Sequence, residues 1–413
     1  MPRILITGNG FDLGFGLPTS YNDFIKIFKH LNKNNELDFS SIYKETEQFD
    51  LLIQNFNQFE IDKKAILELS ERSIKNTWYN FFLQEHSIQT WVDFENRIFY
   101  VLKLISKGIN LLKSKLTTSN SKLNEINKPH EFIVINNIEI LEILKRFNII
   151  SFKNEYRDDD WYKSPFILQN NYYKIKYKHI IDIDSEKILN DIYKSLNEFI
   201  EIFRGYFIYF ILPLYENYKG KIDGHIFNKV DEHYTFNYTP TFEKIIKIKS
   251  VTEYLHGKID YTNEHKIVLG INKTPTKKNR DLYLKFTKTF QKLYLKTNYN
   301  FIRKHNFVYS ESDTCEFQFI FWGHSLNVSD KKYIDEVFEF VKKLKPKRKE
   351  IIIIYHSEKS RFKLLLNLIN IREENEIENL MRDKILKFYR IGSNELLNSI
   401  KRDLYVHNPI HFD

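Results

Sequence analysis

Four of the chain's 12 glycines lie close together, between Gly8 and Gly16, in the segment GNGFDLGFGLPTSY. Glycine costs stability where it is not needed, so such a cluster indicates a tight turn or a close approach to another group. The cluster follows the short apolar run Arg3 to Thr7, which is typical of a buried strand. From Tyr21 the apolar residues recur at helical spacing. The opening therefore predicts a strand, a glycine turn and a helix, as in an α/β fold.

Strand patterns return after residue 228. They are short, apolar and mostly end at Gly, Asn or His: HYTFN (233–237), VTEYLHG (251–257), KIVLGI (266–271), FQFIFWG (317–323) and EIIIIYH (350–356). Helical patterns lie between some of them, at Ser329 to Lys343 and Ser357 to Asn370. Short apolar strands alternating with helices favour a parallel sheet covered on both faces. We therefore predict a Rossmann-like domain built from residues 1–34 and 228–413.

Residues 35–227 have a different pattern, and we expect them to form a mainly helical insertion. WVDFENRIFYVLKLI (91–105) carries one apolar stripe, and a second amphipathic helix starts at Ser185, which we expect to be its N-cap. The most apolar segment, YFIYFILPLY (206–215), is interrupted by Pro213 and falls short of the ~20 residues that span a bilayer. We expect a buried helix end there and no membrane partner.

The composition limits the cell compartments and the binding partners that are compatible with the chain. The 413 residues are enough for two or three domains. The only cysteine is Cys315, so the chain can form neither an internal disulfide nor a cysteine-based zinc site, which favours a reducing cytoplasm. The formal net charge is +9, but lysine supplies most of it and is scattered. Nucleic acid therefore stays open as a partner.

Polar residues cluster where the predicted strands end. Three such ends carry Asn237 and Tyr238, then His256, and then the run Gly323, His324, Ser325, Asn327 and Asp330. Parallel sheets gather the carboxyl ends of their strands on one edge, and doubly wound folds bind ligands there. Together with the glycine turn, these ends predict a ligand site at that edge.

Several of these segments resemble the AbiH family of bacterial abortive-infection proteins, which protect against phage. The matching motifs are GNGFDLGFGLPTSYNDF, WVDFE, FNYT, LHGKI and GHSLN. The resemblance covers most of the chain and implies an anti-phage role. A phage-derived trigger protein and a second copy of the chain are then candidate partners.

The same segments resemble, more distantly, sirtuins and sirtuin-like NAD-consuming defence proteins. Gly8-Asn9-Gly10 and Gly16-Leu17-Pro18 match two glycine motifs, Thr235-Phe236-Asn237 and His256-Gly257 match the catalytic segments, and a strand precedes Gly323-His324-Ser325-Leu326. Thr19, Tyr21 and Thr239 depart from the sirtuin pattern, and the zinc cysteines are absent. The resemblance implies NAD as substrate or ligand and no metal. The residues it implies for nucleotide binding are Gly8, Asn9, Gly10, Phe11, Asp12, Gly16, Pro18, Thr19, Tyr238, Gly323, His324, Ser325 and Asn327.

The resemblance also implies a chemistry. Hydrolysis of NAD to nicotinamide and ADP-ribose would use His256 as the general base and Asn237 to position the ribose or a water molecule. The Asp12 charge would face the cationic nicotinamide ring or the ribose. Structural roles stay open: His256 as a strand-end histidine bonded to a carbonyl, and Asn237 as the cap of the following helix. Two rival functions also stay open, a nucleotide sensor acting through a partner and an RNA-directed toxin.

Glu95 is a separate question, because its position falls on the apolar stripe of its predicted helix. A carboxylate there is expected to be paired or functional. One interpretation is a buried ion pair with a Lys or Arg of the insertion. The other is a side chain that projects from the insertion into the nucleotide pocket.

Overall fold

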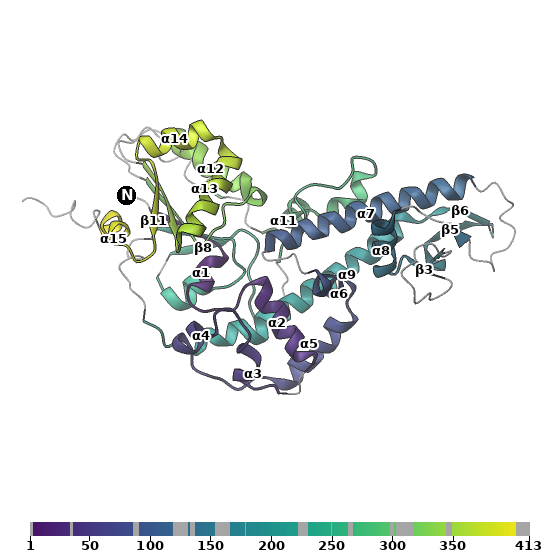
Figure 1. Ribbon diagram of the computed structural model, residues 1–413, viewed down its shortest axis with the longest axis horizontal. Helices are drawn as coiled ribbons and strands as arrows, with labels where there is room; N and C mark the ends of the chain where they lie inside the picture. The colour runs from purple at the N-terminus through teal and green to yellow at the C-terminus, as the bar shows by residue number, and fades with distance from the viewer. Residues whose placement is uncertain are drawn as a thin grey trace, which may run out of the picture. The chain divides into compact units, whose positions relative to one another are not determined.

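The computed structural model describes most of the chain (Figure 1), namely residues 3–33, 36–85, 91–118, 131–132, 137–152, 166–177, 179–221, 230–248, 250–262, 267–297, 301–302, 317–343 and 349–401. The chain divides into two compact units. Unit 1 comprises Met1–Leu67, Arg204–Val268 and Lys292–Asp413, and unit 2 comprises Glu68–Phe203 and Leu269–Gln291. In the described part of the chain, no helix is both long and apolar enough to cross a membrane.

Unit 1 is built on a six-stranded sheet in the order β11-β10-β9-β1-β7-β8, with every neighbouring pair parallel. Its strands are β1 (Arg3–Thr7), β7 (Glu232–Thr235), β8 (Val251–Tyr254), β9 (Phe317–Trp322), β10 (Lys349–Tyr355) and β11 (Leu386–Arg390). Numbered along the chain, the order reads 3-2-1-4-5-6, which reverses between β1 and β9. Thr7 pairs with Thr235 on one side and with Trp322 on the other, so these three strands end level with one another.

Alternating side chains of the central strands enter two apolar layers, as the pleat of a strand requires. One layer packs against helices α12 (Lys331–Lys343), α13 (Glu358–Arg372) and α14 (Glu374–Arg382), which lie together beside β11 in Figure 1. The opposite layer contains Leu5 and Ile352, which are buried with residues of α1 (Asn9–Leu13), η5 (Phe242–Ile246) and α15 (Asn394–Lys401). Both faces of the sheet are therefore covered.

A row of polar side chains crosses four adjacent strands inside this core. Arg3 Nε donates to Gln318 Oε1 at 2.7 Å, and Gln318 Nε2 donates to Glu350 Oε2 at 3.1 Å. The Lys387 ammonium completes the row with a 2.5 Å contact to Glu350 Oε1. Each buried polar group thus has a partner in the next strand, which ties β1, β9, β10 and β11 to one register.

The structure describes further helices in unit 1. They are α2 (Tyr21–Leu31), α3 (Phe39–Tyr43), α4 (Phe49–Asn55), η3 (Phe207–Ile211), α10 (Leu212–Glu216) and η8 (Val328–Asp330). Ser20 and Asp23 form a capping box at the start of α2, which explains why the helix begins directly after the glycine segment. Phe207, Phe210 and Ile211 are buried, in agreement with the prediction for that apolar segment.

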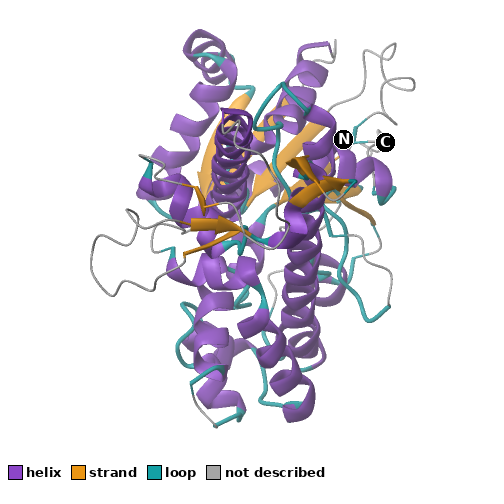
Figure 2. Cartoon of the chain, turned by 90° about the vertical axis from the view of Figure 1, so that its right-hand side faces the viewer, coloured by secondary structure: helices purple, strands orange, loops and turns teal. Residues whose placement is uncertain are grey.

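Unit 2 is mainly helical. It contains α6 (Thr77–Gln84), α7 (Trp91–Thr118), α8 (Ile138–Arg146), η2 (Asn170–Tyr172) and η6 (Arg280–Phe286), and α8 packs against α7 (Figure 1). Its strands form two small antiparallel sheets (Figure 2), from β2 (Glu131–Phe132), β3 (Ile150–Phe152) and β4 (Phe166–Leu168), and from β5 (Tyr173–Lys176) and β6 (His179–Ile183). The remaining helices of the described residues are α5 (Lys63–Lys75), α9 (Ser185–Tyr206) and α11 (Lys288–Tyr294).

The structure confirms the α/β class and the parallel sheet, and it corrects several details. In KIVLGI, the described residues 267–271 form no strand, because the amide of Val268 donates to His256 O and that of Leu269 donates to the Gln291 side chain. The edge strand β11 was not predicted. Asp184, not Ser185, caps α9, since its carboxylate accepts from the amide of Lys187 at 3.1 Å. The unit boundaries also differ from the predicted 34 and 228.

Candidate functional site

The glycine turn after β1 rests directly on the turn after β9. Gly8 N donates to Trp322 O at 3.1 Å, and Gly10 N donates to Gly323 O at 2.9 Å. A Cβ atom on Gly8 would lie 2.7 Å from the Cα of His324, and one on Gly10 would lie 2.9 Å from the Cα of Gly323. Side chains at these positions would push the two backbones apart. The glycines are therefore explained by contact between the turns at the point where the strand order reverses.

This contact changes what the turn offers a ligand. The amides of Gly8 and Gly10 are bonded to the β9 turn, and Phe11 N donates to Gly8 O at 2.9 Å. A phosphate at these three amides would have to displace existing hydrogen bonds. The Phe11 ring packs edge-on against Trp322 with the ring centroids 5.2 Å apart, so its side chain belongs to the core. Nucleotide binding by this turn stays a prediction.

Gly16 and Gly323 have positive φ angles of +87° and +68°. A Cβ on Gly323 would lie 2.0 Å from the backbone nitrogen of Phe11, and one on Gly16 would lie 2.8 Å from the backbone of Leu51 in α4. Both positions therefore need glycine for its backbone angle and for space. Pro18 and Thr19 are buried beyond Gly16, and Pro18 O accepts a hydrogen bond from the Tyr206 hydroxyl.

Asp12 is fully buried beside the end of β7. Its carboxylate accepts hydrogen bonds from the hydroxyls of Thr239 and Thr241, the second at 2.7 Å. Burial raises the pKa of Asp12 from 3.8 to about 7, although hydrogen bonds from Thr239, Thr241 and Asn237 offset part of the rise. A carboxyl group with this pKa changes its charge near neutral pH, at the edge of the sheet where a ligand is expected.

Asn237 joins the ends of β1 and β7. Its Nδ2 donates to Gly8 O at 3.0 Å, and its backbone amide donates to Thr235 Oγ1 at 3.0 Å. The next helix begins at Phe242 after Thr241, so the alternative that Asn237 caps this helix is wrong. The side chain positions the glycine turn and Asp12 rather than an adjacent helix end.

His256, His324 and Asp330 meet at the same edge, although they follow two strands that are not neighbours. His256 Nε2 lies 3.7 Å from Asp330 Oδ1, and His324 Nε2 lies 3.5 Å from Asp330 Oδ2. All three residues are at most 8% exposed, and the ring of Phe236 contacts both imidazoles. His324 Nδ1 accepts from the amide of Leu326, which places the proton of a neutral His324 ring on Nε2, toward Asp330. The carboxylate therefore faces both imidazole rings, at distances that allow an ion pair with a ring that is protonated.

Other predicted residues have contacts that fix loops. The Tyr238 hydroxyl donates to Val268 O at 3.0 Å. Asn327 accepts from the amide of Ser329 at 3.1 Å and caps η8. Ser325 is exposed, Asn9 is half-buried, and neither is brought toward His256 by a contact that the structure shows.

Comparison with known families decides which proteins this chain belongs with. The model of a family described as bacteriophage abortive infection AbiH matches residues 4–356. The chain belongs to the AbiH family. Family membership supports a role in bacteriophage abortive infection. Comparisons with curated proteins and with solved structures gave no match.

Glu95 of this AbiH-family chain forms an ion pair inside unit 2. Its Oε2 lies 2.7 Å from Lys288 Nζ, and both side chains are buried. The buried-ion-pair interpretation is therefore confirmed, with a partner on α11, outside the predicted insertion. A buried pair of this kind ties α7 to α11.

The electrostatic centre of the AbiH site was only partly visible in the sequence. Asp330 was expected at this edge, but its pairing with His256 and His324 was not predicted. Thr239 and Thr241 were missed as partners of Asp12, although the repeated threonines after a strand end in TFNYTPT are a usable signal. Within the described residues, no three His, Cys, Asp or Glu side chains are arranged to hold a metal ion.

Proposed function

We propose that this AbiH-family chain is an abortive-infection effector that binds NAD at the carboxyl edge of its six-stranded sheet and hydrolyses it to nicotinamide and ADP-ribose. The observation that carries the proposal is the meeting of His256, which follows β8, and Asp330 in η8, which follows β9, with 3.7 Å between His256 Nε2 and Asp330 Oδ1. Parallel sheets bind ligands at that edge. The strand order 3-2-1-4-5-6 and the glycine turn after β1 support a Rossmann-like, sirtuin-like nucleotide site.

The proposed reaction breaks the bond between the nicotinamide nitrogen and C1′ of the ribose. The bonding electron pair leaves with the ring, which departs neutral, and positive charge develops on the ribose. A water oxygen bonds to C1′, and the water proton passes to His256 as the general base. Asp330 orients the imidazole and stabilises the imidazolium that forms, as a carboxylate does behind other catalytic histidines.

Two further residues have roles in this proposal. Asp12, buried next to the glycine turn, supplies negative charge that favours the cationic nicotinamide ring and the developing ribose cation. Asn237 holds Gly8 through its side-chain amide and so positions the turn that carries Asp12. Loss of cytoplasmic NAD would arrest the infected cell before phage are released.

A second candidate function is nucleotide sensing without turnover at the same site. His256 is only 8% exposed, so a substrate reaches it only if the surrounding loops move. A sensor would bind the nucleotide in the same place and signal through a partner.

Measuring NAD binding and NAD hydrolysis on the same purified chain distinguishes the two candidate functions. NAD is titrated into the wild type, His256→Ala and Asp12→Asn, and nicotinamide release is then followed after adding lysate from phage-infected cells. Hydrolysis predicts NAD binding that survives His256→Ala and nicotinamide release that does not. Binding with no release in any sample supports the sensor. Absence of NAD binding by the wild type refutes both.

A further inference from the structure

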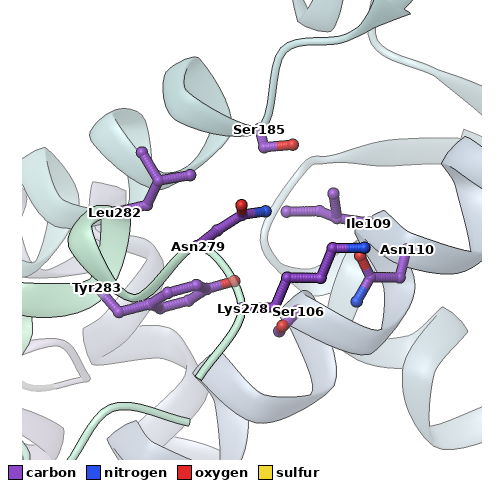
Figure 3. A pocket seen from close by; sticks show the side chains of 8 residues that line it. All are labelled: Ser106, Ile109, Asn110, Ser185, Lys278, Asn279, Leu282 and Tyr283. Carbon is purple, nitrogen blue, oxygen red and sulfur yellow. The ribbon is translucent and has the colours of Figure 1, made fainter. Parts of the chain in front are cut away.

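Unit 2 contains a cavity that is too small for an organic ligand. Its lining includes Ser106, Ser185 and Tyr283 (Figure 3), and its centre has room for about one water molecule. A stronger indication of a binding partner lies on the surface of unit 1, on helix α13.

Helix α13 is apolar on two opposite sides. Leu364, Leu368 and Ile371 pack into the core of unit 1. On the outward side, Phe362 is 71% exposed and Leu366 is 48% exposed. A helix on the surface of a globular protein usually has a polar outward face. Large apolar side chains at adjacent positions of that face therefore indicate contact with another molecule.

The outward apolar residues belong to a longer stripe. The positions that recur every three or four residues along this side of the helix are Lys359, Phe362, Leu366, Ile369 and Glu373. Ile369 is half-buried and packs against the core. The stripe thus has an apolar centre, a positive charge at its start and a negative charge at its end. Its spacing is that of the seam between two paired helices.

The two charges at the ends of the stripe are available to a partner. Lys359 and Glu373 are both exposed, and neither forms an ion pair with another described residue. They lie about four turns apart, or about 21 Å along the helix, so they cannot pair with each other in one chain. Glu358, next to Lys359, is already engaged by Arg361 at 3.3 Å and by the Tyr355 hydroxyl at 3.2 Å.

Glu373 has an unusual backbone conformation at the junction of α13 and α14, with φ of 75° and ψ of 145°. Its amide still donates to Ile369 O at 3.1 Å, so the residue closes the last turn of α13. Glycine takes such a conformation far more easily than a residue with a side chain. A glutamate at this position therefore indicates that the carboxylate has a use there.

We propose that the outward face of α13 is a contact between two copies of this chain, in which the two α13 helices pack antiparallel across a two-fold axis at Leu366. In this arrangement Lys359 of each copy faces Glu373 of the other copy, and Phe362 of each packs near Ile369 of the other. A parallel pair would place the two lysines together and the two glutamates together, which the charges disfavour. The contact is independent of the proposed NAD chemistry.

The expected dimer is weak. Helix α13 has 15 residues and a length of about 22 Å. One pair of such helices buries less surface than the roughly 800 Å² per partner that standard stable interfaces bury. The two exposed ion pairs add little stability, but they select the partner and the direction of packing. We therefore expect a dissociation constant on the order of 10 µM.

Sedimentation equilibrium of the full-length chain, from about 1 to about 200 µM, tests the proposal. The wild type should change from monomer to dimer over this range. Phe362→Ser should weaken the dimer by at least about tenfold, because each dimer contains the residue twice. Ile74→Ser, at an apolar side chain of α5 that is 53% exposed, is the control and should leave the affinity within about twofold. Both positions are exposed, so neither substitution disrupts the core.

Charge reversal tests the direction of packing. Lys359→Glu and Glu373→Lys should each weaken self-association by about fivefold, because each replaces two attractive pairs with two repulsive ones. Mixing the two variants should restore association as dimers with one copy of each, since every charge of the seam then faces an opposite charge. Such a rescue requires contact between copies, because the two positions are too far apart to meet within one helix.

Three results would overturn the proposal. The first is a wild-type chain that stays monomeric up to about 200 µM, which would leave a different protein as the occupant of this face. The second is a dimer that Phe362→Ser leaves unchanged. The third is a mixture of Lys359→Glu and Glu373→Lys that associates no better than either variant alone.

Discussion

Replacing Asp12 by Asn should stabilise unit 1, and the gain should grow with pH. In the folded chain, burial raises the pKa of Asp12 from 3.8 to about 7. The folded state therefore binds a proton between these two pH values where the unfolded state does not, so stability falls as pH rises through this range. Asparagine keeps a similar shape and an oxygen acceptor for the threonine hydroxyls, but it has no charge to bury.

The magnitude follows from the two pKa values. The whole difference corresponds to about 4 kcal/mol, which is fully expressed above pH 7 and absent below the unfolded pKa. Between pH 5.5 and pH 8 the stabilisation by Asp12→Asn should rise by about 2 kcal/mol. The native chain thus loses stability by burying the Asp12 charge. A purely structural residue needs no charge at this position, so this loss agrees with a functional carboxylate.

Denaturant-dependent hydrogen exchange of peptides covering β1 and β9 measures this stability in unit 1. Asp50→Asn, at an exposed carboxyl on α4, is the matched control and should show no such pH-dependent gain. A gain for Asp12→Asn that is equal at both pH values, or a loss at pH 8, would refute the reasoning. Either result would mean that Asp12 is ionised at little cost.

Three further experiments test other parts of the account. Gly323→Ala should destabilise unit 1 far more than Gly392→Ala in thermal unfolding, because both have positive φ but only the first meets backbone atoms; similar losses would contradict the contact between turns. Lys288→Met should cost about 3–5 kcal/mol in urea unfolding, and adding Glu95→Leu should restore most of it; no restoration would contradict the ion pair. Burial lowers the pKa of His233 to about 3, so stability is lost as pH falls from 6.5 toward 3. His233→Gln should reduce that loss in acid titrations, and an unchanged profile would contradict a buried neutral imidazole.

The elements that the sequence predicted best are those with the strongest local patterns. β1 coincides with the predicted run Arg3 to Thr7, and β9 and β10 each contain an uninterrupted apolar run, Phe319 to Trp322 and Ile351 to Tyr355, which is typical of a buried parallel strand. KIVLGI looks equally strand-like, but its backbone bonds to a loop and to a glutamine side chain instead of to a strand. β11 lies at the sheet edge, where a half-exposed strand with charged residues gives only a weak pattern.

In the candidate site, too, features with a local sequence pattern were predicted and long-range contacts were not. The sequence placed His256 and His324 at strand ends, but the pairing of both with Asp330 depends on loops that follow β8 and β9, two strands that are not neighbours in the sheet. The glycines were expected to mark a tight turn or a close approach to another group. They make room for the turn after β9, a long-range contact that no local pattern reveals. The presence of polar residues at the strand ends could thus be predicted from the sequence, whereas the residues that they contact could be identified only from the folded structure.

The most direct test of the proposed function is the NAD content of phage-challenged cells. NAD and ADP-ribose are quantified by mass spectrometry in cells producing the wild type, His256→Ala or Asp330→Asn, with His356→Ala as an exposed-histidine control. The proposal predicts that NAD falls and ADP-ribose rises with the wild type and the control, and that His256→Ala abolishes both changes while Asp330→Asn reduces them. Unchanged NAD in wild-type cells that still arrest would contradict it, and the target would then be sought among RNA and proteins.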